Sequence, residues 1–434
     1  TQYPSQTSNQ IKLAYEVTSF TIHKMTNSSN EIFIIITLNS HELMIIPISN
    51  HLKNLLTSSS NNMNGKRNIS PDSIHSFRRK ITKGASIFVT DDINVALHIP
   101  RGELEIIRPR PLLISKMRYF LEKLDFRSAF RLVRTNRLDM NLLVDDDYQR
   151  FIENSKDFLN AVGYNNLKDG FHIFIAEIND LDSTVASDTY RPIYNAYQAM
   201  EISRTKTVSI QKPKKDKKNI ICDLFKNLSL ELYTNDMHSN PGLFSVFTAC
   251  CIRKNPREIE RVLLKIKEEL DSEDQARINT AEKSIRQIFV IVDDKHKLFR
   301  ESLGTYDKNL FLMVAKRAQI DPTEIAELLK RFEECQPLAF RNANIDIYLK
   351  RFDKALKNLA VSGHELALNE GIRIAKKEKK FAYFISCFTE NDNYQSSDLY
   401  RKVCIEYAEV LAKSHGKLRE AAIYMQFAGE FAKA

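Results

Sequence analysis

Residues 117–133 read MRYFLEKLDFRSAFRLV and decide the fold of most of the chain. Apolar residues recur there twice at i, i+3, i+4 and i+7, first as Met117, Phe120, Leu121 and Leu124 and then as Phe126, Ala129, Phe130 and Val133. Each set falls on one face of a helix with about 3.6 residues per turn. The stretch therefore predicts two amphipathic helices in immediate succession, whose apolar faces must be buried against other helices.

The second pattern, apolar-x-x-Ala-apolar-x-x-apolar, recurs further along the chain. Its later copies are Phe352, Ala355, Leu356 and Leu359, and then Leu418, Ala421, Ala422 and Met425. The small alanine allows a neighbouring helix to approach closely, while the larger side chains fill the groove. Gly363 and Gly429 follow two of the copies, and their separation is close to twice the roughly 34 residues of a tetratricopeptide helical pair. We therefore predict a mainly α fold, with a TPR-like α-solenoid of helical hairpin repeats over residues 109–434.

The first hundred residues have a different period. Apolar runs at 32–38 and 43–48 flank a turn at residues 39–41, and runs at 86–90 and 93–99 flank Asp91-Asp92. Strands separated by such short polar turns are typical of β-hairpins. Because one WD40 blade takes roughly 40–45 residues, residues 1–108 can hold at most two blades. We predict an incomplete WD40-type β-propeller segment, formed by its last blades, ahead of the solenoid.

The composition is that of a folded chain with a modest basic excess. Of 434 residues, 43% are hydrophobic, and 64 Lys and Arg against 55 Asp and Glu give a formal net charge of +9. The longest apolar run, residues 32–38, is far shorter than the roughly 20 residues that span a bilayer. The six cysteines show no C-x-x-C spacing, so we expect free thiols in a reducing compartment. We expect a cytoplasmic protein, with the nucleus as a further location. Because the chain begins without an initiator Met, we also expect it to be an internal fragment.

Motifs for catalysis and metal binding are incomplete in this sequence. His41-Glu42 and His364-Glu365 lack the second His that a zinc-binding helix requires, and no Gly-rich phosphate loop or nucleophile elbow occurs. Asp145-Asp146-Asp147 could hold a hard cation, although a helix N-terminus is the simpler interpretation. Asp293-Asp294 beside His296 could perform acid–base chemistry, although the end of a buried helix explains them as well. We predict no catalytic, cofactor-binding or metal-binding residue, and no enzymatic activity.

Residues 204–219 interrupt the helical pattern with a run of lysines. We expect a disordered loop there, because charge repulsion and Pro213 both oppose regular structure. The candidates for nonspecific contact with RNA are Lys212, Lys214, Lys215, Lys217 and Lys218. Lysines attract phosphate without reading bases, and no aromatic residue is interleaved to stack on them. A solvated loop without a partner is the simpler interpretation, and the sequence leaves both open.

The junction between strands and helices resembles a known family. Residues 99–113 read IPRGELEIIRPRPLL, and the resemblance rests there on Pro100, Arg101, Gly102, Leu104, Glu105 and Arg110. The order and spacing of motifs continue through residues 306–324, 344–356 and 407–430. Together these stretches resemble the scaffold subunit, the largest one, of the Elongator complex, known as the IKAP family. In that family this segment leaves the second β-propeller and enters the helical solenoid.

The resemblance implies a scaffold that has no active site or cofactor of its own. Such a subunit organises a WD40-repeat Elongator subunit and a catalytic radical and acetyltransferase subunit, which modifies the wobble uridine of transfer RNA. It also implies indirect contact with transfer RNA, no contact with membranes, and a homodimer formed through a C-terminal region absent from this chain. The residue pattern alone also fits an unrelated propeller-plus-solenoid adaptor, such as a vesicle-coat or intraflagellar-transport subunit.

Overall fold

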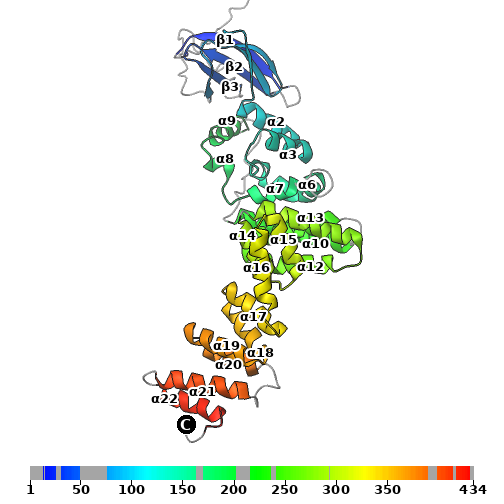
Figure 1. Ribbon diagram of the computed structural model, residues 1–434. Helices are drawn as coiled ribbons and strands as arrows, with labels where there is room; N and C mark the ends of the chain where they lie inside the picture. Colours follow the sequence, from blue (N-terminus) through cyan, green and yellow to red (C-terminus); the bar gives the residue numbers. More distant parts are fainter. Residues whose placement is uncertain are drawn as a thin grey trace, which may run out of the picture. The chain divides into compact units, whose positions relative to one another are not determined.

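The computed structural model of the chain describes residues 13, 15–25, 31–48, 76–162, 170–201, 216–235, 241–292, 294–389, 398–413 and 417–430. These residues are mainly helical, and their strands all precede residue 108 (Figure 1). The predicted mainly α fold, with strands ahead of the helices, is confirmed. The chain divides into two compact units, Thr1–Lys254 and Asn255–Ala434.

The first unit begins with two antiparallel sheets. The first sheet has the order β1 (Val17–Lys24), β2 (Ile32–Leu38), β3 (Glu42–Pro47) and β4 (Phe77–Lys80), and the second has the order β5 (Ser86–Asp91), β6 (Asn94–His98) and β7 (Leu104–Ile107). The turn at 39–41 lies where the sequence predicts it, whereas the second turn is Asp92-Ile93, one residue later than expected. His41 and Asp92 have φ angles of 62° and 37°, a region that polar residues of these types tolerate better than most.

The two sheets share one apolar core. Its buried members are Met25, Phe33, Ile35, Leu43, Ile45, Ala85, Val95, Leu97, Ile107 and Leu112. A second, smaller cluster joins Ile36 and Leu38 of β2 to Met44 and Ile46 of β3. β2 is therefore buried on both faces, which explains why its sequence is apolar at every position except the buried Thr37. Each sheet keeps edge strands, β1 and β4 in one and β5 and β7 in the other, so the described strands close no barrel. Their membership of a propeller stays a prediction.

The first helix, α2 (Arg110–Glu122), is fixed to these sheets. Leu112 belongs to the sheet core, and Lys116 Nζ lies 3.0 Å from Asp92 Oδ2 in the turn between β5 and β6. The imidazole of His23 in β1 lies 2.7 Å from the carbonyl oxygen of the same Asp92. These contacts tie the start of the helical region to both sheets.

The change from strand to helix falls where the sequence places it. β7 ends at Ile107 and α2 begins at Arg110, on either side of the predicted junction between residues 108 and 109. The sheets and the first helices nevertheless belong to one compact unit, Thr1–Lys254. Independent folding of residues 1–108 stays a prediction.

The described residues of the first unit that follow the strands are mainly helical. After α2 they comprise α3 (Phe126–Thr135), α4 (Leu142–Asp145), α5 (Tyr148–Glu153), α6 (Ser155–Val162), α7 (Gly170–Glu177), α8 (Ser183–Ala186), α9 (Arg191–Glu201), α10 (Lys217–Asn235) and α11 (Pro241–Lys254). Neighbouring helices pair, as α2 does with α3 and α10 with α11. The predicted stripe on α2 is too long by one residue, because Leu124 has a φ of 58° and is 39% exposed. Asp125, which caps α3 by accepting the N–H of Ser128, requires a tight turn at that point.

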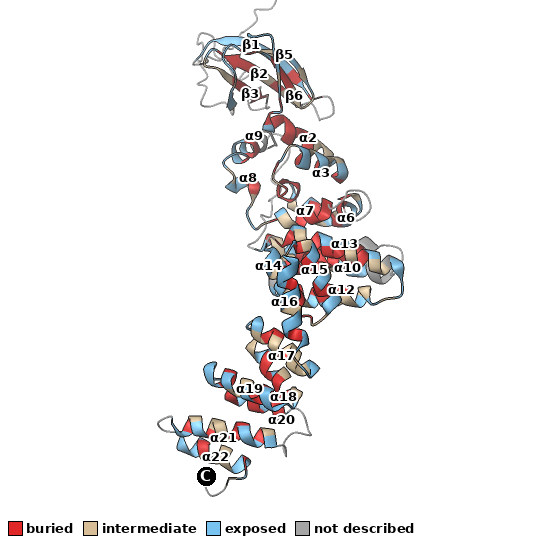
Figure 2. Ribbon diagram, in the orientation of Figure 1, coloured by how far each residue is buried: buried red, intermediate tan, exposed pale blue. Residues whose placement is uncertain are grey.

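Phenylalanines form the centre of this unit. Phe126, Phe151, Phe158, Phe171, Phe174 and Phe225 come from five helices, and neighbouring rings have centroids 4.8 to 6.3 Å apart. All six are buried, and Figure 2 shows buried stretches along α6 and α7. Tilted and edge-to-face ring pairs of this kind stabilise a core beyond the area that they bury. The cluster holds α3, α5, α6, α7 and α10 together.

The second unit is a succession of helices. They are the 3₁₀ helix η3 (Pro256–Glu258), α12 (Ile259–Leu270), α13 (Gln275–Ile291), α14 (Lys295–Leu303), α15 (Lys308–Ala318), α16 (Pro322–Glu333), α17 (Leu338–Tyr348), α18 (Phe352–Ser362), α19 (Glu365–Lys377), α20 (Phe381–Thr389), α21 (Asp398–Ala412) and α22 (Leu418–Phe427). Consecutive helices pair as α12 with α13, α14 with α15, α17 with α18 and α21 with α22. This is the arrangement of helical hairpins that the sequence predicts.

The three copies of the alanine pattern differ in burial. In α3 all four of its residues are at most 4% exposed, and in α18 Ala355, Leu356 and Leu359 are at most 2% exposed. In α22 only Ala421 is buried, and Leu418 is 67% exposed, so the prediction for this copy is wrong in part. Among the described helices α22 packs mainly on α21, which covers the alanine and leaves the first apolar position in solvent.

An arginine links three helices of the second unit. Arg351, at the N-terminus of α18, lies 2.9 Å from Glu260 of α12 through Nη1 and also pairs with Glu301 of α14 through Nη2. Its guanidinium lies so close to Gly304 that any side chain at Gly304 would overlap it. The glycine therefore allows the ion pairs that hold these hairpins in register.

Candidate functional site

The lysine-rich segment, the main candidate from the sequence, is only partly described. Lys212, Lys214 and Lys215 lie outside the described residues. Lys217 and Lys218 do not belong to a loop, because α10 begins at Lys217. The predicted disordered loop at 204–219 is therefore wrong for its last residues. RNA contact by the three lysines outside the described residues stays a prediction.

Lys217 is the opposite of a solvated lysine. Its side chain is fully buried, and Nζ donates to Asp145 Oδ1 at 2.7 Å and to the carbonyl oxygen of Leu181 at 2.6 Å. The backbone N–H of Lys218 donates to Asp180 Oδ1 at 2.9 Å, which caps the start of α10. Lys217 is unavailable to RNA, because removing a buried ammonium from its carboxylate would expose two uncompensated charges.

The three acidic residues at 145–147 are all engaged. Asp145 pairs with Lys217 and also accepts the N–H of Ser183 at 2.8 Å, and burial raises its pKa to about 6 against the lowering effect of the lysine. Asp146 lies 3.1 Å from Arg118 Nε. Asp147 caps α5 by accepting the N–H of Arg150. The helix N-terminus predicted for this cluster is correct for Asp147 alone, and the other two carboxylates neutralise cations.

The junction motif shapes a turn and two close contacts. Gly102 has a φ of 89° between β6 and β7, a conformation that favours glycine. Pro100 packs against Gly84, where a Cβ atom would lie 2.8 Å from the proline Cγ. Arg110 lies over the ring of Tyr190, 5.5 Å from its centroid.

The remaining members of the motif lie at the surface or in weak contacts. Glu105 accepts a long hydrogen bond of 3.4 Å from Thr82, while Arg101 and Leu104 are exposed. None of these residues lines the hollow in the second unit described below. The contacts of the motif position the strands relative to the first helices.

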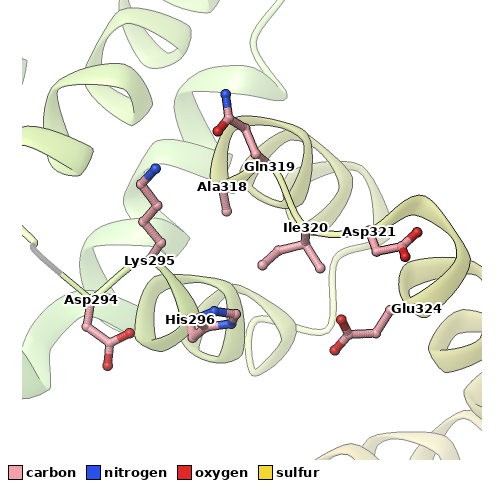
Figure 3. A pocket seen from close by; sticks show the side chains of 8 residues that line it. All are labelled: Asp294, Lys295, His296, Ala318, Gln319, Ile320, Asp321 and Glu324. Carbon is pink, nitrogen blue, oxygen red and sulfur yellow. The ribbon is translucent and has the colours of Figure 1, made fainter.

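The second unit has a shallow polar hollow of about 380 Å³. Figure 3 shows Asp294, Lys295 and His296 along one side of it and residues 318–324 along the other. Asp294 accepts the N–H of Lys297, and Asp321 accepts the N–H of Thr323. Both carboxylates are therefore helix caps, for α14 and α16.

The geometry of this hollow does not support acid–base chemistry by Asp293, Asp294 and His296. Asp293 lies outside the described residues, and the Asp294 carboxylate is engaged by the backbone. His296 is exposed on the open side. The arrangement presents no carboxylate and imidazole in hydrogen-bond contact.

Metal ligands, membrane helices and reactive thiols are the remaining features that could mark a functional site. Within the described residues no group of three or more His, Cys, Asp or Glu side chains is arranged to hold a metal ion. No helix in the described part of the chain is both long and apolar enough to cross a membrane. All six cysteines are free, as predicted, and five of them are buried. Burial raises the pKa of Cys222 to about 11, and it also raises the pKa of Cys250.

Comparison with known proteins assigns the helical region. A family profile described as the ELP1 alpha-solenoid matches residues 110–332, from the first residue of α2 into α16. The chain belongs to the ELP1 alpha-solenoid family. This confirms the resemblance found at the junction motif and the predicted solenoid fold.

Individual relatives extend the similarity over both units. Elongator complex protein 1 of Mus musculus is 28% identical over 416 residues, which cover 94% of this chain and 28% of the relative. The protein of the same name from Schizosaccharomyces pombe is 28% identical over 81% of this chain and 26% of its own length. The one from Arabidopsis thaliana is 30% identical over 63% of this chain and 20% of its own length. The chain thus spans between 20% and 28% of the length of these relatives.

Two features of the site escaped the sequence. The partners Asp145 and Lys217 are 72 residues apart, and no local pattern signals that they meet. The ion pairs of Arg351 with Glu260 and Glu301 are equally invisible in the sequence, because they depend on how three helices pack. No sequence signal marks the first pair, because Lys217 stands in a run of lysines and Asp145 in a run of aspartates.

Proposed function

We propose that the chain is a segment of a non-catalytic scaffold subunit of an Elongator complex. The family match from Arg110 to Phe332 carries this proposal, because it coincides with the helical hairpins of the structure. In this role the solenoid organises a catalytic radical and acetyltransferase subunit and a WD40-repeat subunit for wobble-uridine modification of transfer RNA. The proposal includes a cytoplasmic location, with the nucleus as a further one.

The engagement of the polar clusters supports a scaffold. Two of the carboxylates that the sequence offered for chemistry, Asp147 and Asp294, serve as helix caps, and two others, Asp145 and Asp146, pair with cations. Stacked helical hairpins offer extended surfaces, which are suited to holding several partners at once. The chemistry would belong to the catalytic partner.

Affinity capture of the full-length protein tests this proposal. We expect co-purification of the catalytic Elongator subunit, and we expect mass spectrometry of transfer-RNA nucleosides to show loss of the wobble modification when the protein is depleted. Ala355→Trp, which disrupts packing of the buried α18 face, should reduce recovery of the partner, while the exposed control Lys357→Ala should not. Recovery of vesicle-coat or intraflagellar-transport proteins instead would overturn the proposal. So would modification of transfer RNA by the purified protein freed of its partners.

A further inference from the structure

The polar face of α3 carries arginine and no acidic side chain. Arg127, Arg131 and Arg134, which we name the α3 basic stripe, are exposed. At about 100° per residue they lie within about 60° of one another around the helix axis, and they span about 10.5 Å along it. The opposite face is buried in the aromatic core, so the packing of Phe126 and Phe130 turns the stripe toward solvent (Figure 2).

Further cations extend the stripe at both ends. Lys123 is exposed just before the helix, and Arg137 is exposed just after it. Arg108, also exposed, donates through Nη1 to Asn136 Oδ1 at 3.3 Å, which places its guanidinium at the C-terminal end of α3. The positive region therefore continues beyond the three residues of the stripe.

Few acidic groups offset this charge. None of the ion pairs among the described residues includes Lys123, Arg127, Arg131, Arg134 or Arg137. Asp125 is engaged as the cap of α3. Glu177 is close enough to Arg134 to be affected by it: burial and Asp139 raise the pKa of Glu177, and Arg134 lowers it. Arg127 and Arg131 are thus the most fully available cations.

This arrangement is unfavourable for the isolated helix. Like charges at i and i+4, as in Arg127 and Arg131, repel one another and weaken a helix. Elsewhere in the same unit arginines have acidic partners, as Arg118 has in Asp146 and Arg191 in Asp188. A polyanion bound along α3 would supply the missing counter-charge and relieve the repulsion.

We propose that the α3 basic stripe binds the phosphate backbone of a double-stranded nucleic acid. Guanidinium groups match phosphate with two parallel hydrogen bonds, and a duplex carries one charge per about 1.7 Å of its axis, about six over the length of the stripe. The two aromatic residues of α3, Phe126 and Phe130, are buried and cannot stack on bases. Binding is therefore independent of base sequence and strongly dependent on salt.

The lining of the face favours nucleic acid over an acidic protein. The centre of a protein–protein interface is apolar, with aromatic or aliphatic anchors. Every large apolar side chain of α3 is buried or half-buried, so its exposed face offers arginine, serine and threonine alone. Nucleic-acid interfaces, by contrast, are polar and positively charged. This inference goes beyond the proposed scaffold function, and because its test uses the chain by itself, either can fail without the other.

The test compares two charge-matched variants of the 434-residue chain. The stripe variant is Arg127→Gln, Arg131→Gln and Arg134→Gln, and the control variant is Lys376→Gln, Lys377→Gln and Lys379→Gln at the exposed end of α19. Fluorescence anisotropy measures binding of labelled duplex RNA and of duplex DNA of equal length, from about 50 to about 200 mM salt. Polyglutamate serves as a third probe.

We expect the stripe variant to bind both duplex probes more weakly, and we expect its affinity to vary less with salt concentration. Three lost phosphate contacts, at about 0.9 each on a duplex, reduce the magnitude of the slope of log K against log salt by about 3. The control variant should keep the slope. Arg→Lys at the same three positions should keep most of the salt dependence, because the charge remains. It should weaken binding, because the paired hydrogen bonds to phosphate are lost. The duplex bound more tightly at equal salt identifies the kind of nucleic acid.

Three results would overturn the proposal. An unchanged slope in the stripe variant would show that α3 makes no phosphate contact. Equal flattening in the control variant would show that net charge alone governs binding. Tighter binding of polyglutamate than of either duplex, lost in the stripe variant, would assign the face to an acidic protein. Thermal unfolding followed by circular dichroism verifies that each variant is folded, and the exposed positions of all six residues make this the expected result.

Discussion

Gly371 sets how closely two helices of the second unit approach. It lies in the middle of α19, and its Cβ position is 3.0 and 3.1 Å from Cε1 and Cε2 of Phe384 in α20, with Cζ closer still. Phe384 is fully buried, and its ring makes an edge contact with Phe388 at 5.2 Å. The ring therefore cannot move aside without disturbing the core around it.

Two opposing effects decide the outcome of Gly371→Ala. Replacing glycine by alanine within a helix is worth about 1 kcal/mol in favour of folding. Forcing a methyl group into a filled core costs about 1–3 kcal/mol. Since the overlap with Phe384 is severe, we expect the second effect to dominate, with a net loss of roughly 1 kcal/mol in the free energy of unfolding.

Urea unfolding followed by circular dichroism measures this change, at a constant slope of free energy against denaturant. Lys376→Ala on the exposed side of the same helix is the control and should change stability by less than about 0.5 kcal/mol. Phe384→Leu removes the atoms that clash, so the double variant should be more stable than the sum of the single effects by at least about 0.5 kcal/mol. A stability gain from Gly371→Ala alone would refute the close approach.

Three further substitutions or treatments test other parts of the structure. Ala355→Trp should cost at least about 1–3 kcal/mol by overpacking α18, and the exposed Lys357→Ala less than about 0.5, in thermal unfolding; equal effects would mean that the helix faces are assigned wrongly. Lys217→Met should cost about 3–5 kcal/mol by leaving Asp145 unpaired, and adding Asp145→Leu should restore part of that loss, whereas strict additivity would argue against the ion pair. In the native protein at pH 8, iodoacetamide should label Cys335, which is partly exposed, before Cys222, whose buried thiol has a pKa of about 11; mass spectrometry showing the reverse order would contradict the burial of Cys222.

Much of the fold could be predicted because helix and strand periods are local. The four apolar residues from Phe126 to Val133 are all buried. Asp321 caps α16, and an Asp directly before Pro322 is a local signal for the start of a helix. The hairpin of β2 and β3 turns at the expected residues. In each case the chain's own geometry places the relevant side chains on one face or at one terminus, whatever lies nearby.

The candidate site was harder to predict, because a charged residue that is buried serves as a structural ion-pair partner and not as a surface contact for a ligand. Lys217 has the same sequence neighbourhood as the other lysines of its run, and the sequence assigns it to a solvated loop. The structure instead makes it the first residue of α10 and buries its side chain beside Asp145. The arginines of α3 are the opposite case. Their spacing is visible in the sequence, but they form an exposed basic stripe only because the other face of the helix is buried.

The sequence by itself determined the class of fold, the point near Arg110 where strands give way to helices, the family, and the inward faces of α3 and α18. Those properties depend on short-range periodicity and on motifs, both of which a linear chain carries. Tertiary structure alone decided which distant residues meet, such as Asp145 with Lys217, and which predicted apolar residues stay exposed, such as Leu418. These outcomes depend on loop closure and on the packing of whole helices, whose energies are shared among many residues and are not encoded at any single position.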